Sequence, residues 1–156
     1  MNYFAYGSNM DVGQMASRCP GAVLVGRASL AEHEFRINTH GVATVIPAKG
    51  NEMHGVLWEI ASAHEASLDR YEGVASGFYR KAIVRVRLAE DSEVEALCYI
   101  AGDSRSGHAR PDYMERVLAA AEDNRLPIEY VVELRSRWEI LRTVSKTARG
   151  KVGSSR

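Results

Sequence analysis

Two short stretches of this chain carry residues that could act on a small molecule. The first is the turn Gly7-Ser8-Asn9, which interrupts an apolar run ending at Ala5 and precedes a helix-compatible segment that begins at Met10. Glycine lets the backbone approach a ligand closely and asparagine tolerates a left-handed conformation, so successive N–H groups could converge on an anion. Ser8 or Asn9 could cap the following helix, or the turn could simply reverse the chain.

The second stretch ends in a carboxylate, Glu72, at the C-terminal end of a predicted helix that Gly73 terminates. Helix-end carbonyl groups disfavour a negative charge and should raise the pKa of Glu72, and apolar neighbours such as Val74 and Phe78 could raise it further. A raised pKa suits a general acid–base group that works near neutral pH. A solvated surface glutamate is the alternative interpretation.

Tyr79 and Tyr130 are candidates for orienting a ligand, because a phenol combines an apolar ring with one hydroxyl. Both could instead be core tyrosines. Asp69 precedes Glu72 by one helical turn and could form a carboxylate pair with it, although a salt bridge or a cap is the preferred interpretation for Asp69. The histidines and the two cysteines lack metal-ligand spacing and nucleophile signatures, so no metal site is expected.

Composition limits the remaining possibilities. A chain of 156 residues with 46% hydrophobic and 26% charged residues is typical of one globular domain. Its formal net charge of zero gives no general attraction to nucleic acid or to a membrane, so a small molecule is the expected partner. The apolar runs are shorter than a membrane span and no secretory segment opens the chain, which favours a cytoplasmic protein with reduced thiols.

Apolar periodicity predicts an alternation of strands and helices. Extended segments are predicted at 22–37 with a bend near Gly26, at 42–46 ending at Pro47, at 55–60, and in a hairpin of 78–88 with 94–100. Helices are predicted at 10–18, from Ser62 as the N-cap of a capping box with Glu65, at 113–123 capped by Asp112, and from Pro127 with Ile128, Val131, Leu134 and Trp138 facing inward.

This order predicts a single α+β domain in residues 1–143, with five or six strands in a mixed or antiparallel sheet that curls into a small barrel surrounded by helices. Residues 144–156 are polar and basic and contain no acidic residue, which predicts a flexible C-terminal tail.

Five segments of the chain resemble the gamma-glutamylcyclotransferase superfamily, whose members release 5-oxoproline from gamma-glutamyl compounds. They occur in the expected order: Tyr3 to Met10, Gly41 to Val45, Leu68 to Val74, Ser76 to Tyr79 and Leu126 to Tyr130. The resemblance implies a similar fold, Glu72 as the catalytic acid–base group and no cofactor. It also implies a substrate site made from Tyr6, Gly7, Ser8, Asn9, Met10, Tyr79 and Tyr130. Arg125 departs from the pattern, since a glycine is expected before Leu-Pro.

The reaction implied is an attack of the substrate's own alpha-amine on its gamma-carbonyl, which expels an amino acid or an amine. A gamma-glutamyl amine or isopeptide is an alternative substrate, because the residues facing the leaving half are expected in loops such as Asp103 to Arg110. A different alternative is a non-catalytic protein that senses a gamma-glutamyl or other carboxylate ligand. Either protein could be a monomer or a homodimer.

Overall fold

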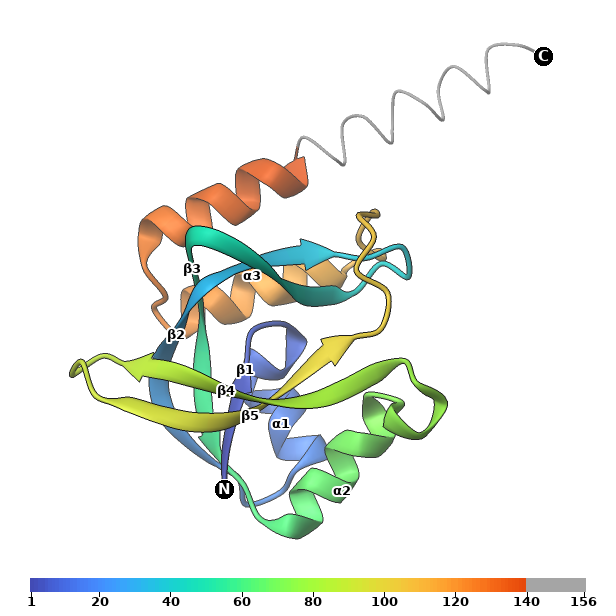
Figure 1. The fold of residues 1–156 in the computed structure, drawn as a ribbon, viewed down its shortest axis with the longest axis vertical. Helices are drawn as coiled ribbons and strands as arrows, with labels where there is room; N and C mark the ends of the chain where they lie inside the picture. The colour runs from blue at the N-terminus through green and yellow to red at the C-terminus, as the bar shows by residue number, and fades with distance from the viewer. Residues whose placement is uncertain (140–156) are drawn as a thin grey trace.

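The computed structural model of the chain describes residues 1–139, and the predicted tail at 144–156 lies outside them. Five strands form a closed barrel in the order β1-β3-β2-β4-β5 (Figure 1). Their bounds are Asn2–Ala5 for β1, Val23–Ile37 for β2, Ala43–Glu59 for β3, Tyr79–Leu88 for β4 and Glu93–Ala101 for β5. The β1–β5 pair is parallel and the other pairs are antiparallel, which confirms the predicted mixed barrel.

The longest hairpin joins β2 to β3, and it corrects one prediction. Segments 42–46 and 55–60 are not separate strands but the two ends of β3, which continues through Pro47. Pro47 pairs with His33 beside a register shift, and a bulge of this kind tolerates a residue without an N–H. A second register shift lies between Leu24 and Gly26, at the predicted bend.

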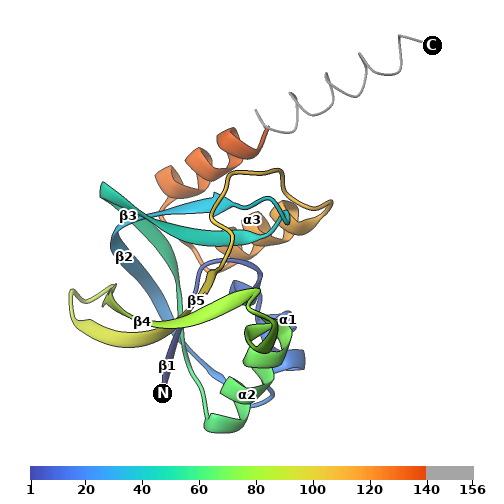
Figure 2. The same cartoon turned by 45° about the vertical axis from the view of Figure 1, so that its right-hand side comes forward.

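Helices cover the outside of the barrel, and α1 and α2 lie side by side at one end of it (Figure 2). The short helix η1 spans Ser8–Met10, followed by α1 at Val12–Arg18, α2 at Ser62–Tyr71, η2 at Val74–Ser76 and α3 at Tyr113–Asp123. A further helix occupies 128–139 as far as the described residues extend. None of the helices within residues 1–139 is long and apolar enough to cross a membrane.

The helix caps differ from the predicted ones. Asp11, rather than Ser8 or Asn9, caps α1, and its Oδ1 accepts the Gln14 N–H at 2.9 Å. The first turn of α2 begins one residue earlier than predicted, with Ala61 as N-cap and Ser62 as the first helical residue.

The side chains at the starts of α2 and α3 also differ from the predicted capping pattern. His64, rather than Glu65, reaches back to the cap, because its Nδ1 accepts the Ala61 N–H at 3.0 Å. Asp112 does precede α3, but its side chain makes no capping hydrogen bond. In the last helix Val131 and Leu134 are buried as predicted, whereas Ile128 is 71% exposed.

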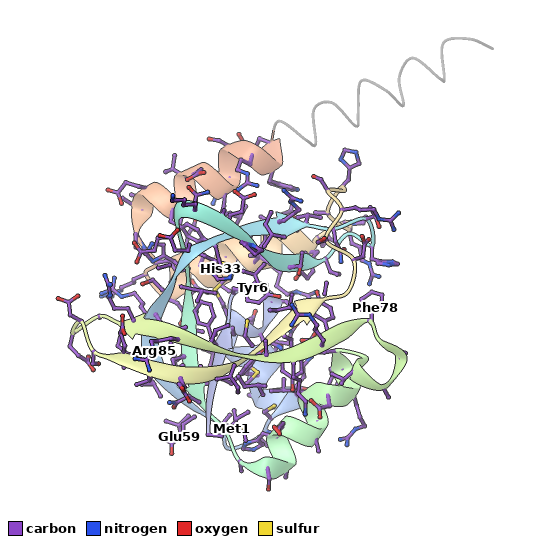
Figure 3. All side chains as sticks on the ribbon, viewed as in Figure 1. Met1, Tyr6, His33, Glu59, Phe78 and Arg85 are labelled. Carbon is purple, nitrogen blue, oxygen red and sulfur yellow. The ribbon has the colours of Figure 1, made fainter. Side chains whose placement is uncertain are left out.

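The core of the barrel fixes the end of β1 and therefore the turn that follows it. Gly55 on β3 faces β1 so closely that a Cβ atom there would lie 2.3 Å from the Ala5 carbonyl oxygen. Phe4 and Tyr6 are buried on either side of Ala5, with Tyr6 inside the barrel and Arg85 on its outer surface (Figure 3). The turn thus follows a closely packed part of the sheet.

Candidate active site

A cavity of about 350 Å³ opens where the end of β1, the ends of α1 and α2 and the start of α3 meet. Its size is within the range of small-molecule sites. Glu72 and the turn residues Gly7, Ser8 and Asn9 all line it. The two stretches that the sequence singled out, which are more than sixty positions apart, therefore share one cavity.

Asn9 connects these two stretches. Its side chain is 4% exposed, and its Nδ2 donates to Glu72 Oε1 at 3.2 Å and to the Tyr3 hydroxyl at 2.9 Å. Its Oδ1 accepts from Gln14 Nε2 at 2.9 Å and from Arg18 Nη1 at 3.0 Å. Because two donors occupy the amide oxygen, the amide nitrogen must face the carboxylate. We call Tyr3, Asn9 and Glu72 the Glu72 wall.

The backbone of Asn9 is also held from the core. Its carbonyl oxygen accepts the indole N–H of Trp58 at 3.0 Å, and Trp58 lies on β3 with 3% of its surface exposed. Asn9 is therefore fixed both at its main chain and at its side chain, so the position of the Glu72 carboxylate is set by the barrel.

Glu72 is the C-cap residue of α2 and is half-buried. Burial is the main cause that raises the pKa of its carboxyl, and the charge of Arg18 and the hydrogen bond from Asn9 partly oppose it. The direction agrees with the sequence-based expectation, although the main cause is desolvation rather than the helix-end carbonyl groups. A partly desolvated carboxylate beside an open cavity can accept and return a proton.

Asp69 does not pair with Glu72. It accepts from the Tyr99 hydroxyl at 2.7 Å and from Lys81 Nζ at 3.0 Å, so the salt-bridge interpretation is confirmed. Glu72 is consequently the one carboxylate that lines the cavity in the described part of the chain.

Tyr6 and Tyr79 line the cavity with their rings, while their hydroxyls bind the main chain. The Tyr6 hydroxyl donates to the Tyr99 carbonyl oxygen and the Tyr79 hydroxyl to the Ala43 carbonyl oxygen, both at 2.5 Å. Burial raises the pKa of both phenols. Each hydroxyl proton is thus used within the protein, and both rings shape the cavity.

The structure does not bring Met10 and Tyr130 to this cavity. The Met10 side chain is fully buried in the core, and its N–H donates to the Gly7 carbonyl oxygen at 3.1 Å. Tyr130 packs edge-on against His54 with ring centroids 4.9 Å apart. Its buried hydroxyl lies beside the His54 backbone and makes no hydrogen bond of good geometry within residues 1–139. The helix that carries Tyr130 covers another part of the barrel, so this side chain does not line the cavity in this structure.

Tyr113 lines the cavity but was not predicted from the sequence. Its hydroxyl accepts the Ala43 N–H at 3.2 Å and also contacts Ser8. A Cβ atom on Gly7 would lie only 2.9 Å from that hydroxyl, so the absence of a side chain at Gly7 makes room for it. One feature of the sequence could have identified Tyr113. It is an aromatic residue at the start of the helix that follows loop 103–110, and this loop is expected to face the leaving half of the substrate.

Three arginines, Arg18, Arg110 and Arg116, also line the cavity. Arg18 and Arg116 belong to no motif and were not predicted, whereas Arg110 ends the loop that was expected to face the leaving half. The Arg18 guanidinium stacks over the Tyr71 ring at 4.6 Å from its centroid. Among residues 1–139 no group of three or more histidine, cysteine, aspartate or glutamate side chains is arranged to hold a metal ion.

Comparisons with known proteins identify relatives of this chain. Residues 52–134 match the AIG2-like family. A bovine gamma-glutamylcyclotransferase is 32% identical over 144 residues, covering 86% of this chain and 77% of the relative, and the human gamma-glutamylcyclotransferase is 31% identical over the same extent. A solved structure of a gamma-glutamyl cyclotransferase superimposes with a TM-score of 0.81 at 30% identity, covering 86% of each chain.

Proposed function

The chain belongs to the gamma-glutamylcyclotransferase family, and on that premise we propose that it cyclises gamma-glutamyl compounds and releases 5-oxoproline. The observation that carries this proposal is the placement of Glu72 beside Asn9 in a cavity lined by the opening turn. One carboxylate next to a small-molecule site suits a reaction in which the nucleophile belongs to the substrate.

In this reaction the alpha-nitrogen of the glutamyl group forms a bond to its own gamma-carbonyl carbon, and the bond from that carbon to the leaving nitrogen breaks. The alpha-amine is protonated at neutral pH, so it must lose a proton before it attacks. Glu72 takes this proton and then delivers one to the departing nitrogen. The raised pKa of Glu72 supports both transfers, because it brings the carboxyl closer to the amine in basicity.

The cavity also has to hold the glutamyl group in a folded conformation. We assign its alpha-carboxylate to the turn Gly7 to Asn9 and to Arg18, which lie next to Glu72 around the Asn9 side chain. Backbone N–H groups of the turn would stabilise negative charge that develops on the gamma-carbonyl oxygen. Met10 is not part of this assignment, since its N–H is bonded to Gly7. The proposed steps exchange one C–N bond for another and move protons, with no change of oxidation state, so they require no cofactor.

The test is release of 5-oxoproline from a gamma-glutamyl dipeptide by the purified protein. The matched control substrate is the same dipeptide with an acetylated alpha-amine, which retains both carboxylates but lacks the nucleophile. We expect lactam release from the free dipeptide and none from the acetylated one. Binding of the free dipeptide without any release would instead identify a sensing protein and overturn the proposal.

We also propose a cytoplasmic location. Cys19 and Cys98 are buried free thiols, and unpaired cysteines of this kind are usual in reducing compartments. Fractionation of the cells that produce the protein would test this, and recovery with a membrane or secreted fraction would contradict it.

A further inference from the structure

The cavity has three arginine side chains, whereas a gamma-linked glutamyl group has only one free carboxylate. Arg18, Arg110 and Arg116 line the cavity together with one carboxylate, Glu72. None of the ion pairs formed within residues 1–139 includes any of these three arginines. The charge of Arg18 acts on Glu72, but Arg110 and Arg116 have no carboxylate partner within residues 1–139. Two such guanidinium groups at one small-molecule cavity indicate an anionic ligand.

The three arginines hold different places in the cavity. Arg18 lies beside the Glu72 wall, since its guanidinium donates to Asn9 Oδ1 and stacks on Tyr71. Arg110 and Arg116 stand on either side of Tyr113 in the sequence and are exposed. We call Arg110 and Arg116 the arginine rim.

The side chains of the arginine rim are positioned but not neutralised. Arg110 Nε donates to the His40 carbonyl oxygen at 2.8 Å, and its stem packs against Gly41, where a Cβ atom would lie 2.7 Å from Arg110 Cγ. Arg116 Nη1 donates to Gln14 Oε1 at 3.3 Å. These bonds use one N–H of each guanidinium, which has five, so each retains donors for a carboxylate.

We propose that Arg110 and Arg116 are specificity-determining residues that bind the carboxylates of an acidic leaving amino acid. This inference rests on the proposed function. With the glutamyl alpha-carboxylate at the turn and Arg18, the rim offers two further cations, and a leaving aspartate or glutamate offers two further carboxylates. The preferred substrates are therefore gamma-glutamyl-aspartate and gamma-glutamyl-glutamate, followed by gamma-glutamyl derivatives of neutral amino acids, and finally gamma-glutamyl amines.

The experiment measures kcat/KM for 5-oxoproline release with gamma-glutamyl-glutamate, gamma-glutamyl-alanine and gamma-glutamyl-butylamine. We expect about a tenfold fall for each carboxylate removed from the leaving half, the usual scale for a hydrogen bond to a charged group. The value for gamma-glutamyl-glutamate should also fall most steeply with added salt, because exposed charges are screened.

Variants of the rim assign this preference to its residues. Arg110→Gln and Arg116→Gln should each lower kcat/KM for gamma-glutamyl-glutamate by about tenfold, mainly through KM, and change the value for gamma-glutamyl-butylamine by less than about twofold. Arg110→Lys should recover part of the loss, since it restores the charge without the planar guanidinium. Arg87→Gln is the matched control, because Arg87 is an exposed arginine of β4 that does not line the cavity.

The outcomes separate this inference from the proposed function. If none of the three substrates releases 5-oxoproline, the proposed function fails. If all three are cyclised with similar kcat/KM, the function stands and the rim has no role in selectivity. If the rim variants lower kcat/KM equally for acidic and amine substrates, Arg110 and Arg116 support the structure of the site and the inference is wrong.

Discussion

The Glu72 wall and the arginine rim lie in one cavity but differ in how their polar groups are satisfied. In the wall, Asn9 uses every hydrogen-bonding group of its side chain, and Trp58 holds its main chain from the core. In the rim, two exposed guanidinium groups make one bond each to neutral acceptors. A proton-transfer group must be held rigidly, whereas a group that binds a variable leaving half can remain solvated until the substrate arrives.

This contrast predicts that changes in the wall affect the rate of chemistry and that changes in the rim affect the choice of substrate. The largest expected effect is that of Glu72→Gln, which retains the shape of the side chain and an acceptor for Asn9. It should lower kcat by on the order of 10²–10⁴, the scale of a lost acid–base group, with little change in KM. Rates of 5-oxoproline release measure this, and full turnover by the variant would rule out Glu72 as the acid–base group.

Asn9→Asp tests whether the Glu72 wall sets the pKa of the Glu72 carboxyl. The substitution places a second negative charge next to Glu72 and removes the N–H donor, and both changes raise the pKa of Glu72 further. Since Glu72 acts as a base only when ionised, the acidic limb of kcat/KM against pH should move to higher pH. At pH values below the acidic limb, kcat/KM should fall by roughly tenfold for each pKa unit of displacement. An unchanged acidic limb would show that Asn9 does not set the pKa of Glu72.

Two variants compare Tyr113, which lines the cavity, with Tyr130, which was predicted from its motif but lies outside the cavity. Tyr113→Phe removes a hydroxyl that lies between Ala43 and the turn, so kcat/KM should fall by about tenfold, the scale of one lost hydrogen bond. Tyr130→Phe removes a hydroxyl outside the cavity and should leave kcat/KM within about twofold. A larger loss at Tyr130 than at Tyr113 would reverse the assignment of these two phenols.

The smallest expected effect concerns stability. The folded protein raises the pKa of Glu72 mainly through burial, so ionisation of this group costs stability, and the cost grows as the pH rises from the ordinary glutamate pKa through the raised one. Glu72→Gln should therefore have a higher Tm than the unmodified protein at pH 7, with a difference that shrinks near pH 4. Thermal unfolding at both pH values tests this, and equal Tm values at pH 7 would mean that burial imposes no net cost on this carboxylate.

The sequence predicted the barrel and the pairing of Glu72 with the turn because both depend on local patterns. Alternation of apolar residues defines the strands, and the two motifs contain their own turn residues. The sequence predicts two strands at 42–46 and 55–60 in place of one. The polar stretch between them is the exposed part of β3, and it lacks the alternation of apolar residues that marks a strand.

The site residues that were missed depend on tertiary contacts. Arg116 is an exposed polar residue without a motif, and the sequence indicated Arg110 only as the end of a loop expected to face the leaving half. The closure of the barrel places both at the cavity. Tyr130 was predicted from its motif, but its side chain packs against His54 and does not line this cavity. Arg125, where a glycine was expected, adopts a positive φ of 55°, a conformation that glycine adopts without strain, and it does not line the cavity.

The peptide backbone of Ala43, at the first position of β3, bridges two phenols of the cavity. Its carbonyl oxygen accepts from Tyr79 and its N–H donates to Tyr113. Systematic replacement of side chains by alanine would pass over this position entirely, since nothing beyond the methyl group can be removed there. Replacement of the Val42–Ala43 amide by an ester would remove the N–H that donates to Tyr113. It would thereby measure the contribution of this hydrogen bond, which side-chain mutagenesis cannot test.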